Sequence, residues 1–87
     1  MLQGQNVDVL SVCTARGAIR PLRLRLDTGA EPLRVEIDEI LSEKEIAYVG
    51  VEAKIFLCRA RVGGSVRTLE LRYNIRAHTW SLTRAAI

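Results

Sequence analysis

The sequence is poor in aromatic residues, with one Trp, two Tyr and one Phe among its 87 residues. Proteins that bind single-stranded nucleic acids usually stack bases on exposed aromatic side chains that are interleaved with basic residues. Phe56 and Tyr73 fall at positions that an alternating pattern assigns to a core, which leaves Tyr48 and Trp80 for such a role. Trp80 is better explained as the largest side chain of a small core. The scarcity of aromatic residues therefore argues against base recognition by stacking.

Signatures of catalysis and metal binding are also missing. His78 is the only histidine, and neither a nucleophile nor an orienting acid lies near it in the sequence. Cys13 and Cys58 lie far apart, so together with His78 they lack the close ligand pair that zinc sites usually contain. No P-loop, GxSxG, GxGxxG or EF-hand pattern occurs. We therefore expect a non-enzymatic protein without cofactor or bound metal.

Long hydrophobic runs are absent as well. The longest apolar runs fall far short of the roughly 20 residues that a membrane helix needs. The N-terminal stretch MLQGQNVDV has neither the charged nor the apolar region of a signal peptide. We therefore expect a cytoplasmic protein that does not bind membranes. In that compartment Cys13 and Cys58 stay as thiols, and we expect both to be buried strand residues.

The length and composition are those of a single folded domain. Apolar residues make up 48% of the chain and charged residues 26%, which distinguishes it from a disordered sequence. A chain of this length forms one core but has little material for a deep substrate cleft. We expect one domain over residues 1–87, with an ordered core at about 7–82 and flexible ends at 1–6 and 83–87.

The net charge of +3 conceals an uneven distribution of charge along the chain. Residues 1–26 and 53–87 are basic, whereas residues 27–52 contain two basic and eight acidic residues. Such asymmetry is found in proteins that bind nucleic acids or acidic partners. It is also expected where oppositely charged strands neutralise each other across a sheet. The sequence leaves both explanations open.

Alternation of apolar and polar residues predicts strands along most of the chain. The first is Val7 to Thr14, which is rich in β-branched and apolar residues and is followed by a turn around Gly17. Further alternating runs predict strands over residues 22–26, 33–37, 54–62, 67–75 and 77–82. The sequence therefore predicts a mainly β protein.

The first predicted hairpin contains arginines at alternate positions in the stretch RPLRLRLD. In one register Arg25 lies opposite Glu36, every outer pair is of opposite charge, and GAEP is the loop. In the register two residues away, Arg25 faces Arg34. Because directly opposed like charges are unfavourable, the sequence predicts the complementary register. The arginine row is then a neutralised sheet surface rather than a track for phosphates.

A short helix is predicted between the third and fourth strands. Ser42 can cap it, Glu45 can reach back to the cap, and Gly50 can end the helix after about two turns. The dense carboxylates within residues 38–45 suit the start of a solvated helix, where the helix dipole favours negative charge. Their pattern does not match a calcium-binding loop.

The second predicted hairpin joins KIFLCRARV and RTLELRYNI through the stretch GGS. With GGSV as the loop, Arg59 faces Glu70. A shift of two residues keeps the same side chains inward, so the core assignment does not depend on the register. The core residues predicted in this hairpin are Phe56, Cys58, Leu69, Leu71 and Tyr73.

Two candidate binding sites follow from this hairpin. Ile55 and Leu57 make its first strand apolar on the outer face too, so either the helix or another chain is expected to cover them. We take these two residues as a candidate partner interface. Four arginines have no obvious carboxylate partner within the hairpin and are candidates for contacts with nucleic-acid phosphates: Arg61, Arg67, Arg72 and Arg76.

The order of the stretches GAIRPLRLRLD, VEIDEIL and KIFLCRARV, with Trp80 near the end, resembles that of a group of short uncharacterised bacterial proteins. In that group a Pro-led strand, an IDxIL-like segment, a YxCxI-like strand and a terminal Trp recur. The resemblance covers roughly residues 17–82 and implies a small β-rich fold without an assigned activity. Some members are encoded near error-prone DNA polymerase genes, which implies a repair accessory role without locating a site. Here Phe56 stands where the group has a Tyr, and VGVEAKIF replaces its Gly-rich stretch.

Together these patterns predict a mainly β fold, an antiparallel curled sheet or partly open barrel of five to six strands with one short helix. The leading hypothesis for function is a non-enzymatic module that binds a protein partner or forms a homodimer. The alternative is a nucleic-acid-binding accessory protein that uses the arginines of the second hairpin.

Overall fold

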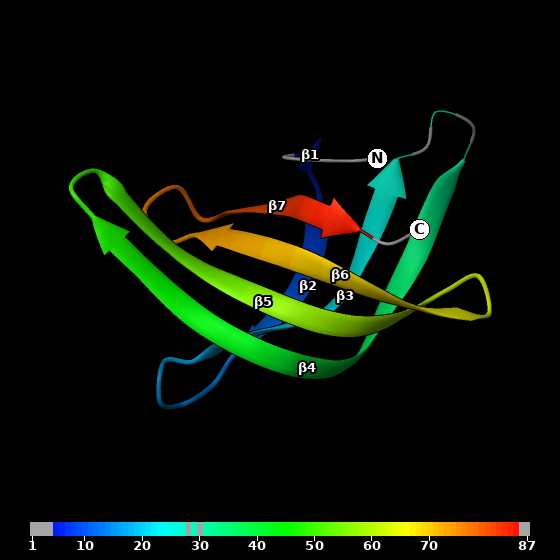
Figure 1. The fold of residues 1–87 in the computed structure, drawn as a ribbon, viewed down its shortest axis with the longest axis horizontal. Coiled ribbons are helices and arrows are strands. Elements are labelled where there is room, and N and C mark those ends of the chain that lie inside the picture. The colour runs from blue at the N-terminus through cyan, green and yellow to red at the C-terminus, as the bar shows by residue number, and fades with distance from the viewer. Residues whose placement is uncertain (1–4, 28, 30, 86–87) are drawn as a thin grey trace.

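The computed structural model describes residues 5–27, 29 and 31–85, which form a single seven-stranded antiparallel sheet and contain no helix (Figure 1). The strands are β1 (Gln5–Asn6), β2 (Asp8–Cys13), β3 (Ile19–Asp27), β4 (Pro32–Tyr48), β5 (Val51–Val62), β6 (Ser65–Asn74) and β7 (Thr79–Ala85). The predicted mainly β class and curled antiparallel sheet are confirmed. The predictions of five to six strands and of a helix are wrong.

The sheet curls into a half-barrel with the strand order β1-β7-β6-β5-β4-β3-β2. The N-terminal segment supplies the strands at both ends of this order, since β1 pairs with β7 and β2 pairs with β3. Asn6 of β1 lies opposite Ser81 of β7, and Val7 N–H donates to the Trp80 carbonyl at 3.1 Å. Immediately after Val7 the chain enters β2, which pairs with β3. The strands thus extend beyond the expected core at 7–82. The flexibility predicted for residues 1–4 and 86–87 lies outside the described residues.

The predicted helix is the second half of β4. Its residues pair with β5 as far as Tyr48 opposite Val51, and Ile46 lies opposite the buried Ala53. The capping pattern around Ser42 is a local preference, and antiparallel pairing with β5 along one edge of these residues outweighs it. Gly50, predicted to end the helix, instead has a φ of 80° in the tight turn between the two strands.

Two β-bulges bend β4. The pairing with β5 shifts by one position at Asp38 and again at Leu41, so each of these residues is an extra one without a direct partner on β5. A bulge bends its strand and increases the local twist. In Figure 1, β4 accordingly runs along β3 at its start, turns, and continues beside β5 to the far end of the molecule.

The β3–β4 hairpin adopts the register that the sequence analysis rejected. Leu26 lies opposite Leu33, and Arg25 lies opposite Arg34. The leucines face the core in either register, so only the exposed charge pairs distinguish them, each contributing about 0.2–1 kcal/mol. A neighbouring strand supplies a partner for Arg25, because Oδ2 of Asp8 on β2 lies 2.9 Å from its Nη2. The prediction of a fully neutralised hairpin surface is therefore wrong.

The β5–β6 hairpin turns through Gly63 and Gly64 alone. Both have a positive φ, of 56° and 88°, as a two-residue type I′ turn requires. The loop is thus shorter than the predicted GGSV, and the pairs shift by two positions, which places Arg59 opposite Thr68 rather than Glu70. The same side chains still face inward.

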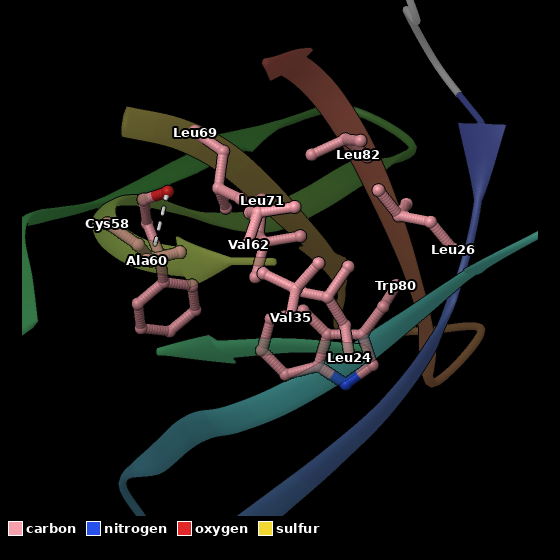
Figure 2. Close-up of a cluster of buried hydrophobic side chains, with 11 residues drawn as sticks. Leu24, Leu26, Val35, Cys58, Ala60, Val62, Leu69, Leu71, Trp80 and Leu82 are labelled. Atoms are coloured by element: carbon pink, nitrogen blue, oxygen red, sulfur yellow. Dashed lines mark hydrogen bonds between the residues drawn. The ribbon is translucent and has the colours of Figure 1, made fainter. Parts of the chain in front are cut away.

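The core lies on the inner face of the curl, where buried side chains from β3, β4, β5, β6 and β7 converge (Figure 2). Trp80 lies between two aromatic rings, with its ring centroid 5.6 Å from that of Phe56 and 4.8 Å from that of Tyr73. The predicted core residues of the second hairpin are confirmed: Phe56, Cys58, Leu69 and Leu71 are buried and Tyr73 packs against them. Each large buried side chain contributes about 1.5–3 kcal/mol.

Candidate binding surfaces

The arginines proposed as nucleic-acid contacts do not form one surface. Arg61 on β5 has a carboxylate partner on the neighbouring strand, because its Nη2 lies 3.2 Å from Oδ2 of Asp38. Asp38 is the extra residue of the first bulge in β4. Strand alternation places both Arg61 and Arg72 on the outer face of the sheet. They are nevertheless far apart, because Arg72 lies opposite Ile55, and Ile55 is six residues, or roughly 20 Å, from Arg61 along β5.

Arg67 and Arg76 lie elsewhere. Arg67 shares the alternation of the buried Leu69, so it sits on the inner side of the sheet at an exposed rim. Arg76 lies in the turn between β6 and β7, where its backbone N–H donates to Oδ1 of Asn74 at 3.1 Å. The four arginines are thus distributed over the two faces of the sheet and a turn.

The candidate partner interface at Ile55 and Leu57 is largely covered by the chain itself. Ile55 is 8% exposed, and Leu57 is half-buried. Their outer-face neighbours include Arg72, whose long aliphatic stem can cover apolar surface. No helix contributes, because residues 42–50 are strand and turn. In the single chain Ile55 offers almost no area to a partner.

Acidic residues of β4 neutralise basic residues of β5. Besides the pair of Asp38 with Arg61, Glu39 binds Arg59, and Glu43 lies 3.7 Å from Nζ of Lys54. Each pair has at least one side chain that is about half exposed, so it contributes little free energy, but together the pairs account for much of the charge asymmetry in the sequence. For these strands, the explanation by neutralisation across the sheet is the correct one.

One edge of β4 has no strand partner over most of its length. The pairing with β3 covers Pro32 to Glu36, whereas residues 37–48 pair with β5 on their other side. Within the described ranges no strand pairs with this second edge of residues 37–48, which we call the free β4 edge. An unpaired edge presents backbone N–H and C=O groups that another strand can bind.

The free β4 edge ends in an exposed apolar turn. Tyr48 is 69% exposed and Val49 is fully exposed at the tip of the β4–β5 hairpin. The tip is not evident from the sequence, because the helix-start signal around Ser42 makes Gly50 look like the end of a helix. The available signal for a hairpin is Gly50 flanked by aromatic and β-branched residues in the stretch IAYVGVEA.

The two cysteines differ in environment. Cys58 is buried as predicted, its thiol donates to the Phe56 carbonyl at 3.8 Å, and desolvation by burial raises its pKa to about 11. Such a thiol is poorly reactive at neutral pH. Cys13 lies on a strand, but it is exposed rather than buried. It is the last residue of β2, which is itself the last strand of the sheet order.

His78 lies in the turn before β7 with a positive φ of 56°. Its backbone N–H donates to the Asn74 carbonyl at 2.9 Å, and its ring Nδ1 lies 3.0 Å from the Tyr73 hydroxyl. These contacts give it a structural position in the turn. Among the residues that the structure describes, no group of three His, Cys, Asp or Glu side chains is arranged to hold a metal ion.

A groove of about 460 Å³ crosses β2, β3 and the start of β4. Arg23, Arg25 and Arg34 line it together with the carboxylate of Asp8. The site is not evident from the sequence, because the register predicted for the β3–β4 hairpin pairs each of these arginines with a carboxylate.

No protein-family model, curated protein or solved structure matches the chain. Among the described residues there is no helix of the length and hydrophobicity required to cross a membrane. The assignment of function therefore rests on the surfaces described above.

Proposed function

We propose that this chain is a non-enzymatic protein-interaction module whose free β4 edge accepts an extended segment of a partner. The observation that carries this proposal is the length of unpaired strand at residues 37–48, which ends in the exposed Tyr48 and Val49. In strand addition, backbone hydrogen bonds supply affinity, and side-chain contacts next to the edge supply specificity.

The charge at the Tyr48 end of the edge favours a basic partner. Glu39 and Glu43 are already paired with Arg59 and Lys54, but Glu45 is exposed and forms no ion pair with the described residues. Exposed charge on an edge strand also discourages pairing with an identical edge. A strand that carries Lys or Arg meets no such repulsion. Tyr48 is suited to contact the end of that strand, because tyrosine supplies a large apolar area and a hydroxyl at low cost in conformational entropy.

Site-specific photo-crosslinking in cells tests the proposal. A photoreactive phenylalanine derivative at position 48 is expected to give an adduct of defined mass. The matched control has the same photoreactive residue in place of Val66, which is 58% exposed and lies in β6 just after the β5–β6 turn. This control is expected to give no adduct. Val49→Asp is expected to abolish the adduct from position 48. An adduct of twice the chain mass would identify a homodimer, whereas other masses would identify a different protein.

The proposal fails if position 48 gives no adduct, or if position 66 gives the same adducts. Circular dichroism of each variant establishes that the sheet is retained. The three substituted positions, 48, 49 and 66, are all exposed, so each replacement is expected to change the free energy of unfolding by less than about 0.5 kcal/mol.

Nucleic-acid binding is the alternative function, and the separation of the four arginines weakens it. Fluorescence anisotropy of labelled DNA and RNA at low and physiological salt tests this alternative. Micromolar binding at physiological salt that Arg72→Glu and Arg76→Glu weaken would support the alternative. Absence of binding at low salt would eliminate it.

A further inference from the structure

The groove across β2, β3 and β4 combines exposed cationic groups with an apolar wall. Arg23, Arg25 and Arg34 line it, and Leu10 and Pro32 contribute apolar surface. Leu10 is half exposed on β2, the last strand of the sheet order, which pairs with β3. The volume of about 460 Å³ lies within the range typical of small-molecule sites.

The arginines are only partly neutralised. Arg25 is bound to Asp8 at 2.9 Å, but both side chains are more than half exposed, so the pair is weak. Arg34 is further from its nearest carboxylate, with 4.0 Å between its Nε and Oε1 of Glu36. Arg23 forms no ion pair with the described residues. The groove therefore retains positive charge.

The register brings two of these side chains together. Arg25 and Arg34 are directly opposed on β3 and β4, and the Cβ atoms of such pairs lie about 4.5–5.5 Å apart. Two guanidinium groups carried by such a pair repel each other, and a dianion between them would replace that repulsion with charge-assisted hydrogen bonds. Guanidinium forks match the oxygen geometry of phosphate, which carries about two negative charges at neutral pH as a monoester.

We propose that this groove binds a phosphomonoester with an apolar body. The phosphate lies between Arg25 and Arg34 with Arg23 beside it, and the apolar body lies against Leu10 and Pro32. The site is separate from the free β4 edge, so it does not depend on the proposed interaction with a partner protein.

Titration of the full chain with hexyl phosphate, inorganic phosphate and hexanol at low salt, followed by amide chemical shifts in NMR spectra, tests the proposal. Hexyl phosphate is expected to give saturable shifts at Arg25, Arg34 and Leu10. Inorganic phosphate is expected to bind more weakly, because it lacks the apolar body, and hexanol is expected not to bind. Arg25→Gln and Arg34→Gln are each expected to lower the affinity for hexyl phosphate about tenfold or more, since hydrogen bonds between charged groups contribute strongly to binding.

Arg76→Gln is the matched control, because it removes the same charge from an exposed turn outside the groove. It is expected to leave the affinity within about twofold of the original chain, since Arg76 does not line the groove and water weakens the interaction between exposed charges. Dispersed spectra of all three variants establish that they are folded. The proposal is overturned if the chemical shifts do not saturate with hexyl phosphate, or if inorganic phosphate binds as tightly as hexyl phosphate. It is also overturned if Arg76→Gln lowers the affinity for hexyl phosphate as much as Arg34→Gln does.

Discussion

Arg25 and Arg34 lie directly opposite each other on β3 and β4, a cross-strand pair of like charge on the outer face of the sheet. Such a pair is destabilising in the absence of a ligand. We therefore expect Arg34→Gln to raise the free energy of unfolding by about 0.2–1 kcal/mol at low salt. Urea denaturation followed by circular dichroism measures this difference.

The salt dependence of this gain distinguishes electrostatic repulsion from a change in strand propensity. At about 1 M salt, where the Debye length is roughly 3 Å, the difference between Arg34→Gln and the original chain is expected to shrink. Arg76→Gln, in the β6–β7 turn, is expected to have little effect at either salt concentration. A gain from Arg34→Gln that persists unchanged at high salt would contradict the explanation by charge.

The β5–β6 turn provides a second prediction, which concerns the backbone alone. Gly64 has a φ of 88°, and a Cβ built on it meets no heavy atom within 4 Å. Gly64→Ala is nevertheless expected to destabilise the fold by about 1–2 kcal/mol, because L-residues with a side chain disfavour positive φ. The measurement is again the free energy of unfolding in urea.

Gly63→Asn is the control for this turn. Asn tolerates a positive φ, and Asn-Gly is a preferred type I′ pair, so the variant is expected to be close to neutral. If Gly63→Asn destabilised the chain as much as Gly64→Ala, the conformation of the turn would not be the cause.

Much of the fold could be predicted from the sequence, because alternation fixes which side chains face inward. Alternation assigns Phe56, Leu69 and Leu71 to the core in any of the possible registers, since a shift of two residues leaves the inward face unchanged, and all three are buried. The same insensitivity explains why the registers themselves were wrong. The leucines allow several registers, and the partner that Arg25 finds on β2 is not evident from the hairpin alone.

The error over residues 42–50 has a similar cause. Ser42 and Glu45 carry a local signal for a helix start, whereas the strand depends on pairing with residues 51–57. Local signals can be recognised within a few residues, but pairing and bulges depend on the whole sheet. For the same reason the arginine groove could not be foreseen, because it exists only in the observed register of β3 and β4.

The aromatic cluster provides a third prediction. Phe56 is fully buried and contacts Trp80, so Phe56→Ala is expected to cost about 3–5 kcal/mol, a large part of the stability of a small domain. Phe56→Leu keeps most of the volume and is expected to cost less, which leaves a folded variant to measure. Val66→Ala, at an exposed position, is the control and is expected to change stability by less than about 0.5 kcal/mol. Equal losses for Phe56→Leu and Val66→Ala would contradict the assignment of this core.

The buried thiol of Cys58 makes stability depend on pH in the alkaline range. Burial raises its pKa from 9.0 to about 11, so the folded state favours the protonated thiol. The stabilisation is therefore complete below pH 9 and is lost as the pH rises towards 11, by an amount on the order of 2 kcal/mol. Cys58→Ala removes this titration, and its unfolding free energy is expected to fall less over the same interval. Because Cys13 is exposed, iodoacetamide is expected to alkylate it in the native protein while Cys58 reacts only after unfolding. If the original chain and Cys58→Ala lost the same unfolding free energy between pH 9 and 11, or if Cys58 were alkylated rapidly in the native protein, the thiol would not be shielded from water.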